Sequence, residues 1–292
     1  MTEHADIEHR MNDAPPPLVP DEAGREVVLS VRDVTVAFGD NVVLDRLSLD
    51  VYRGEILGFV GASGTGKSVL LRTVLGLTPK RSGTVSMFGV DLDTLDDTER
   101  FHIDMRQGVL FQHGALFSAL TVRENIQVPM REYLDLPKPL MDELAMLKLE
   151  LVGLSPDAAD KFPSQLSGGM IKRAALARAL ALDPDIVFLD EPTSGLDPIG
   201  AAEFDELVAK LRDTMGLTVY MVTHDLDSLF SVCDRIAVLG KKKVLVEGTV
   251  EDMMRVEDPW VKSYFRGKRA RSIVRPDGQP NRSGNGAGTL NG

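Results

Sequence analysis

The sequence predicts an α/β fold in which short buried strands alternate with helices. Three apolar runs support this prediction: EILGFVG at 55–61, IVFLDE at 186–191 and LTVYMVTHD at 217–225. Continuous apolar runs of this length are typical of parallel strands that are buried on both faces. A helical pattern follows the first run at 68–77, and another helix is expected at about 200–214, between the second and third runs.

The segment GASGTGKS at 61–68 matches the phosphate-binding pattern G-x-x-x-x-G-K-[ST] at every fixed position. Glycines let the backbone N–H groups approach a polyphosphate, and the following helix directs the positive end of its dipole there. Lys67 adds a charge at the β- and γ-phosphates, and the Ser68 hydroxyl is a hard ligand for Mg²⁺. A surface loop matches by chance in about one sequence in a hundred of this length, so a nucleotide site is favoured. Its expected contacts are Gly61, Ala62, Ser63, Gly64, Thr65, Gly66, Lys67 and Ser68.

The composition narrows the class of protein. The chain has 292 residues, of which 43% are hydrophobic, and this is enough apolar material for one large core. Its net charge of −11 argues against nucleic-acid binding, which needs a basic surface. No run approaches the ~18–20 apolar residues needed to span a bilayer, and the polar N-terminus lacks a secretory signal. The single cysteine, Cys233, excludes an intrachain disulfide and fits a reducing, cytoplasmic setting.

The chain divides into four parts. Expected boundaries are a disordered N-terminal tail at 1–26, one domain at 27–250, a C-terminal helix and basic segment at 251–275, and a disordered tail at 276–292. Alternation of apolar and polar residues early in the domain predicts antiparallel strands around a turn at Gly39–Asn41. Helical periodicity broken by prolines predicts a helical subdomain inserted at about 113–180.

Two carboxylates, Asp190 and Glu191, follow the second apolar strand. Ligands in open parallel sheets bind at the carboxyl ends of strands, so Asp190 can hold Mg²⁺ and Glu191 can polarise an attacking water. A strand that ends in a helix-capping Asp is also common. The upstream phosphate loop favours the magnesium interpretation.

A second glycine-rich helix start, LSGGM, stands at 166–170. It predicts another anion-binding helix N-terminus, although Ser167 could simply cap an ordinary helix. A chain with one nucleotide has no use for a second such site. A head-to-tail dimer does, because each helix can face the γ-phosphate held by the other chain.

The ordered set GASGTGKS, LSGGM, FLDEPTSGLD and THD resembles the ATP-binding subunit of an ABC transporter over roughly residues 27–250. The resemblance implies a P-loop NTPase fold with a mixed sheet core, an antiparallel β subdomain and an inserted helical subdomain. It implies ATP and Mg²⁺ as ligands, ATP hydrolysis, a head-to-tail homodimer and a membrane permease partner. The residues it assigns to catalysis are Lys67, Gln112, Glu191 and His224, and those it assigns to the metal are Ser68, Gln112 and Asp190. Its further nucleotide contacts are Phe38, Ser167, Gly168, Gly169 and Asp197, with Phe38 either stacked on adenine or part of the core.

Met170 departs from the family pattern, which more often has Gln at that position. With Met170 at this position, the sequence resembles the MlaF-like ATPases of Mla/Mce-type systems. The segments at 111–132, 148–154 and 258–267 are similar to the same ATPases. That similarity implies transport of phospholipid or another hydrophobic molecule between the inner and outer membranes, which maintains outer-membrane lipid asymmetry. It implies a place at the cytoplasmic face of the inner membrane, with a STAS-type subunit and a periplasmic Mce-type protein as further partners.

Other classes within the superfamily fit less well. A DNA-repair ATPase needs a coiled-coil insertion or zinc-type cysteines, a translation factor carries two ATP sites, and a non-hydrolytic scaffold would lack Glu191 or His224. The remaining alternative is an ABC system for a different substrate, such as organic solvent export or amino-acid import.

The C-terminal segment raises one more question. Trp260, Val261, Tyr264 and Phe265 would share one face of a short helix, and five basic residues follow at 266–275. This helix either packs on its own domain or reaches a neighbouring subunit. The basic run is either a solvated tail or a contact for an anionic membrane or an acidic partner.

Overall fold

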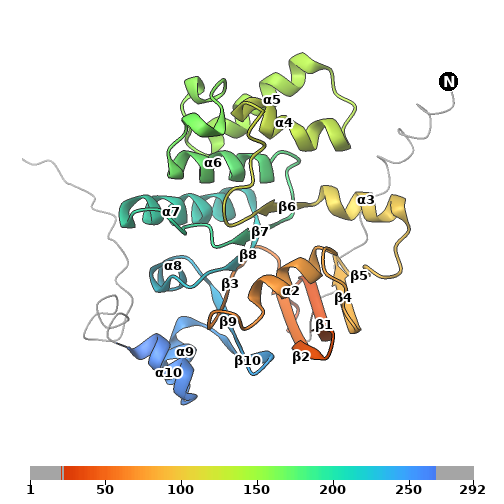
Figure 1. Ribbon diagram of the computed structural model, residues 1–292, viewed down its shortest axis with the longest axis vertical. Coiled ribbons are helices and arrows are strands. Elements are labelled where there is room, and N and C mark those ends of the chain that lie inside the picture. Colours follow the sequence, from red (N-terminus) through yellow and green to blue (C-terminus); the bar gives the residue numbers. More distant parts are fainter. Residues whose placement is uncertain (1–20, 22, 268–292) are drawn as a thin grey trace, which may run out of the picture.

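The fold contains two β-sheets with helices packed around them (Figure 1). The computed structural model describes Asp21 and residues 23–267. The tails expected at 1–26 and 276–292, and the basic run beyond Gly267, lie almost wholly outside the described residues. The predicted α/β fold with a mixed sheet and an antiparallel sheet is confirmed.

The larger sheet has the strand order β10-β9-β3-β8-β7-β6. Its strands are β3 (Ile56–Gly61), β6 (Gln107–Leu110), β7 (Ile186–Asp190), β8 (Thr218–Val222), β9 (Arg235–Gly240) and β10 (Lys243–Gly248). The first five strands are parallel, and β10 pairs antiparallel with β9. Every residue of β3, β7 and β8 is buried, which explains their continuous apolar sequences. Asp190 pairs with Val222 and Phe59 pairs with the same Val222, so these three strands end together.

The smaller sheet is antiparallel, with the order β2-β1-β4-β5. Its strands are β1 (Val27–Phe38), β2 (Asn41–Tyr52), β4 (Ser82–Met87) and β5 (Val90–Asp91). Phe38 pairs with Asn41, so the turn consists of Gly39 and Asp40. Gly39 has a φ of 58°, which glycine adopts without strain.

The described residues form nine α-helices. They are α2 (Lys67–Val74), α3 (Asp97–Met105), α4 (Val122–Tyr133), α5 (Lys138–Leu151), α6 (Gly168–Ala179), α7 (Pro198–Met215), α8 (Leu226–Ser231), α9 (Val250–Arg255) and α10 (Pro259–Arg266). Helices α4, α5 and α6 form a layer at the top of Figure 1, and α9 and α10 lie together at its lower left. Helix α2 lies between the two sheets. No helix within the described part of the chain is long and apolar enough to cross a membrane.

Local signals explain where the helices begin. Asp96 and Thr121 form capping boxes with Glu99 and Glu124, and these start α3 and α4. Pro137 stands at the N-cap of α5, where the missing N–H of proline costs nothing. Helix α3 was not among the predicted elements. Its residues are mostly polar, and only Ile103 is buried.

Candidate active site

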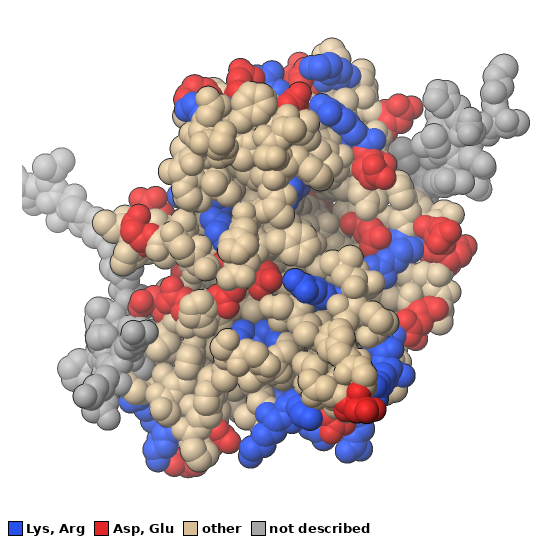
Figure 2. All heavy atoms as spheres, in the orientation of Figure 1, with Lys and Arg blue, Asp and Glu red and all other residues tan. Residues whose placement is uncertain are grey.

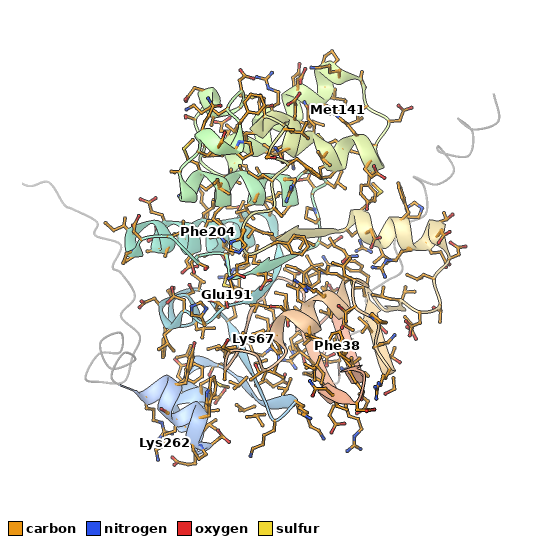
Figure 3. The ribbon with its side chains drawn as sticks, in the orientation of Figure 1. Phe38, Lys67, Met141, Glu191, Phe204 and Lys262 are labelled. Carbon is orange, nitrogen blue, oxygen red and sulfur yellow. The ribbon has the colours of Figure 1, made fainter. Side chains whose placement is uncertain are left out.

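The candidate site lies at the carboxyl edge of the larger sheet. The phosphate loop follows β3, the two carboxylates follow β7, and His224 follows β8. Because these strands are neighbours and end together, three motifs that are far apart in the sequence meet at one edge. Lys67 and Glu191 accordingly lie near each other at the centre of the view in Figure 3.

The phosphate loop wraps around the Lys67 side chain. Lys67 donates from Nζ to the carbonyl oxygen of Gly61 at 2.7 Å and to that of Ala62 at 3.3 Å. Gly66 has a φ of 112°, and a Cβ there would lie 2.9 Å from Val43 Cγ1, so only glycine fits. Burial lowers the pKa of the Lys67 ammonium, and the carboxylates of Glu191 and Asp190 oppose this shift. The loop thus holds a positive charge at the start of helix α2, as expected of a phosphate site.

Asp190 is a buried carboxylate with an unused acceptor. Its side chain is 9% exposed, and its Oδ1 has no hydrogen-bond partner. Burial raises the pKa of Asp190, while the positive charges of Arg72, Lys172 and Lys67 lower it. A buried acceptor without a donor is costly unless a cation or a bound molecule satisfies it.

Glu191 and His224 form a close pair. The Glu191 Oε2 atom lies 2.6 Å from His224 Nδ1. Glu191 has a φ of 50°, a region in which residues other than glycine are strained, and its N–H donates to Val222 O at 2.8 Å. The two neighbouring carboxylates therefore differ in their surroundings. Glu191 contacts His224, whereas the Oδ1 atom of Asp190 has no partner.

Sequence reasoning missed Lys172, which lies on α6 and is almost fully buried. Its Nζ donates to the carbonyl oxygens of Gln112 and of Glu191, the latter at 3.0 Å. Burial lowers the pKa of Lys172, and Asp190 and Glu191 oppose this shift. Lys172 therefore ties the helix that starts with the Ser-Gly-Gly turn to both loops that carry predicted catalytic residues.

Three further predicted site residues are accessible. Gln112 and Ser68 are exposed, and only the backbone oxygen of Gln112 is engaged by Lys172. Phe38 is 54% exposed at the end of β1, which excludes the alternative that it belongs to the core. An exposed aromatic ring at this position remains free to stack on a planar base.

The Ser-Gly-Gly turn does not meet the phosphate loop within the described chain. It begins α6 in the upper helical layer of Figure 1, whereas α2 lies between the two sheets in the lower half of the view. Ser167 caps α6 by accepting from Met170 N at 3.3 Å, and Asp197 caps α7 by accepting from Ile199 N and Gly200 N. Ser167 and Asp197 are both exposed, and a Cβ on Gly168 would lie 3.9 Å from Leu196. The two predicted loops therefore form one accessible surface.

Met170 packs against the core instead of facing that surface. The apolar side chain therefore contributes to the packing of α6. Ser167 and Gly168 are exposed, so they and the backbone N–H groups of the turn remain available to an anion.

A phosphate loop at the carboxyl edge of a mixed sheet, with a carboxylate–imidazole pair at the same edge, defines a nucleotide-hydrolysing cassette. Residues 44–194 match the model of the ABC transporter family. The chain belongs to this family, as its motifs predicted, and the family's activity is ATP hydrolysis coupled to transport.

Several relatives share most of its length. The chain is 38% identical over 241 residues to the intermembrane phospholipid transport system ATP-binding protein MlaF of Haemophilus influenzae, across 82% of this chain and 91% of that protein. It is 37% identical over 243 residues to the probable ribonucleotide transport ATP-binding protein mkl of Mycobacterium leprae, across 83% and 70%. A solved dimeric structure of the cassette MJ0796, in a post-hydrolysis state bound to ADP and Pi, superposes with a TM-score of 0.69. Its identity is 31%, across 76% of this chain and 98% of that chain.

Proposed function

We propose that this chain hydrolyses ATP to power a transporter that moves phospholipid, or another hydrophobic molecule, between the inner and outer membranes. The contact of 2.6 Å between Glu191 and His224 carries the catalytic part of the proposal. In this role Glu191 polarises the attacking water, and His224 contacts the γ-phosphate. Lys67 supplies positive charge on the opposite side of the reacting phosphate.

Magnesium fits the chemistry of the proposed site. The orphaned Oδ1 of Asp190 is the kind of hard oxygen ligand that Mg²⁺ prefers, and the exposed Ser68 hydroxyl and Gln112 amide add two more. Within the described residues, no group of three or more His, Cys, Asp or Glu side chains could hold a metal alone. A shared site completed by phosphate oxygens and water is therefore the form that these residues support. The ion would neutralise charge on the transferring phosphoryl group.

A head-to-tail homodimer would complete the active site. The turn at Ser167–Gly169 starts α6, which lies apart from α2 in Figure 1, and the turn is accessible together with Asp197. In the proposed dimer they contact the nucleotide held by the partner's phosphate loop. The dimeric state of the similar cassette MJ0796 supports the formation of a dimer.

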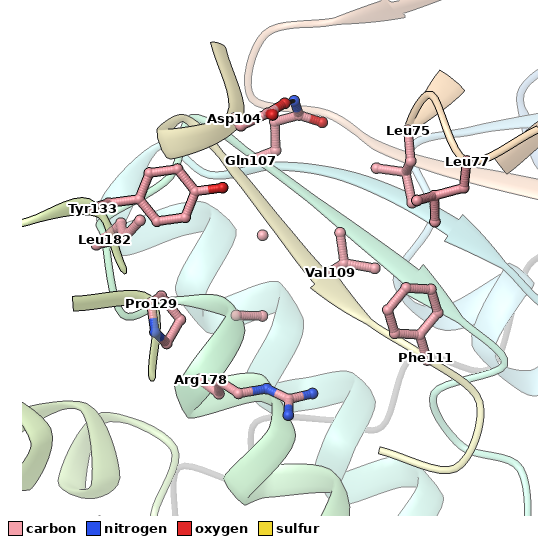
Figure 4. A pocket seen from close by; sticks show the side chains of 12 residues that line it. Leu75, Leu77, Asp104, Gln107, Val109, Phe111, Pro129, Tyr133, Arg178 and Leu182 are labelled. Carbon is pink, nitrogen blue, oxygen red and sulfur yellow. Dashed lines mark hydrogen bonds between the residues drawn. The ribbon is translucent and has the colours of Figure 1, made fainter. Parts of the chain in front are cut away.

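The permease is proposed to dock at the pocket in Figure 4. This pocket lies between α3, α4, α6 and β6, next to the Gln112 loop, and it is lined by Leu75, Leu77, Asp104, Gln107, Gly108, Val109, Phe111, Pro129, Tyr133, Arg178, Ala179 and Leu182. Leu77 is 63% exposed there, and an exposed apolar anchor beside a cavity is typical of a helix-docking surface. Movement of the helical layer on ATP binding would then be transmitted to the membrane subunit.

The lipid part of the proposal is supported by the identity of 38% to MlaF proteins over most of the chain. By the same likeness, the chain would act as a peripheral subunit at the cytoplasmic face of the inner membrane. A STAS-type subunit and a periplasmic Mce-type protein would be its further partners. Organic solvent export or amino-acid import is the alternative.

Purification of the tagged chain from its native membranes tests the substrate directly. We expect one permease to co-purify and the reconstituted complex to transfer labelled phospholipid only when ATP is present. A matched complex that carries Glu191→Gln should assemble but transfer none. Co-purification of an amino-acid or solvent permease would contradict the lipid assignment and leave the ATPase assignment intact.

A further inference from the structure

A hydrogen bond from the C-terminal helix reaches the catalytic loop. Tyr264 on α10 donates from its hydroxyl to the backbone oxygen of His224 at 2.7 Å. The two residues are 40 positions apart, and Tyr264 lies outside the part of the chain that matches the family model, residues 44–194.

Among the described residues, His224 itself has few other hydrogen bonds. His224 lies between the end of β8 and the start of α8, and its side chain is 67% exposed. Its ring contacts Glu191, and the flanking Asp225 N–H donates to Thr223 Oγ1 at 3.0 Å. The bond from Tyr264 is therefore a main restraint on the peptide group that follows His224.

Tyr264 is itself held firmly. Its ring stacks on Trp260, with 4.9 Å between centroids and 14° between planes. The next residue, Phe265, is fully buried and packs edge-on against Phe230 of α8 at 6.1 Å. Asp258 caps the helix by accepting from Trp260 N at 2.9 Å. Burial raises the pKa of Tyr264 well above its usual value, so the hydroxyl keeps the proton that it donates.

We propose that Tyr264 is a positioning residue for ATP hydrolysis, because it orients the His224 peptide so that the imidazole meets Glu191. This inference rests on the proposed role of the Glu191–His224 pair. Without the hydroxyl, the loop samples more orientations, and the imidazole spends less time in the reactive one. The Tyr264 hydroxyl bonds to the His224 backbone and not to the phosphate loop, so we expect nucleotide affinity to be retained.

The test compares wild type, Tyr264→Phe and Tyr52→Phe in the full chain by steady-state ATPase kinetics. Tyr52→Phe is the matched control, because its hydroxyl also takes part in a hydrogen bond of 2.7 Å, with Arg25. We expect Tyr264→Phe to lower kcat by about 3–10-fold and leave KM within about twofold. We expect Tyr52→Phe to keep both constants within about twofold of wild type.

A double mutant separates positioning from a general structural effect. In a His224→Ala background, single-turnover rates with and without Tyr264→Phe should agree within about twofold, because no imidazole is left to orient. An unchanged kcat in Tyr264→Phe, or an equal loss in both backgrounds, would overturn the inference. If the wild type does not hydrolyse ATP, the proposed function itself fails.

Discussion

The carboxylate of Glu191 and the imidazole of His224 meet at 2.6 Å although they follow two different strands. Parallel pairing of β7 with β8 places the two strand ends side by side, and Glu191, just after β7, has a left-handed backbone with a φ of 50°. Strain of this kind persists where the surrounding structure enforces it. Here the enclosing elements are two fully buried strands.

Mixing experiments test the composite site. Ser167→Arg should block the turn of α6, and Lys67→Ala should remove the charge from the phosphate loop, so neither homodimer should hydrolyse ATP. In a mixed head-to-tail dimer both defects fall on one site and the other site is intact. We expect the mixed dimer to recover up to about half of the ATPase activity of a wild-type dimer. If heterodimers form, as crosslinking can show, and no activity returns, the arrangement across the dimer is wrong.

The docking pocket predicts a permease-specific defect. Leu77→Asp places a charge on an exposed apolar anchor of the pocket and should reduce capture of the permease by about tenfold or more. ATP affinity of the isolated chain should stay within about twofold, because Leu77 lies beyond the end of α2. Met215→Asp, at an exposed apolar residue outside the pocket, is the control. Equal capture by the two variants would place the permease elsewhere.

Asp205 predicts how stability depends on pH. Burial raises the pKa of Asp205 to about 7, and its Oδ2 accepts from Ser228 Oγ at 2.6 Å. Its folded pKa is above the unfolded value, so its contribution is complete at low pH and is lost as pH rises through about 7. We expect the free energy of unfolding, relative to Asp205→Asn, to fall by about 2–3 kcal/mol between about pH 5 and pH 8. Urea unfolding of both proteins measures this difference, and parallel pH profiles would show that Asp205 ionises normally.

The C-terminal helix is part of the domain core. Val261 and Phe265 are fully buried, and Trp260 and Tyr264 are partly buried against the same cluster. Phe265→Ala should therefore lower the free energy of unfolding by about 3–5 kcal/mol. Lys262→Ala, on the exposed side of the same helix, should change it by less than about 1 kcal/mol.

This packing answers part of the question raised by the sequence, since α10 rests on its own chain. Truncation after Gly248 would expose the cluster, so it should destabilise the domain itself as well as any assembly. A Phe265→Ala protein as stable as wild type would show that α10 is only loosely attached.

The strands and the main motifs were predictable because their signals are local. β3, β7 and β8 are continuous apolar runs, and the glycines of the phosphate loop stand at fixed spacing. Helix α3 was missed because its residues are mostly polar, although the Asp96–Glu99 capping box was a local signal.

Tertiary contacts account for the rest. A lysine in a helix normally faces solvent, and nothing near Lys172 in the sequence indicates that it reaches two carbonyl oxygens on other loops. The bond from Tyr264 to His224 likewise depends on how α10 packs. The periodicity of the C-terminal segment predicted the helix but not the contact.

The most direct test of the account is the ATPase rate of Glu191→Gln measured beside its ATP affinity. We predict a loss of about 10²–10⁴-fold in turnover with ATP affinity retained, because the amide cannot polarise water and the Lys67 loop is unchanged. Lys67→Ala provides the contrast, since it should lose ATP affinity itself. A Glu191→Gln protein that keeps most of the wild-type rate would contradict the central claim that Glu191, paired with His224, drives hydrolysis.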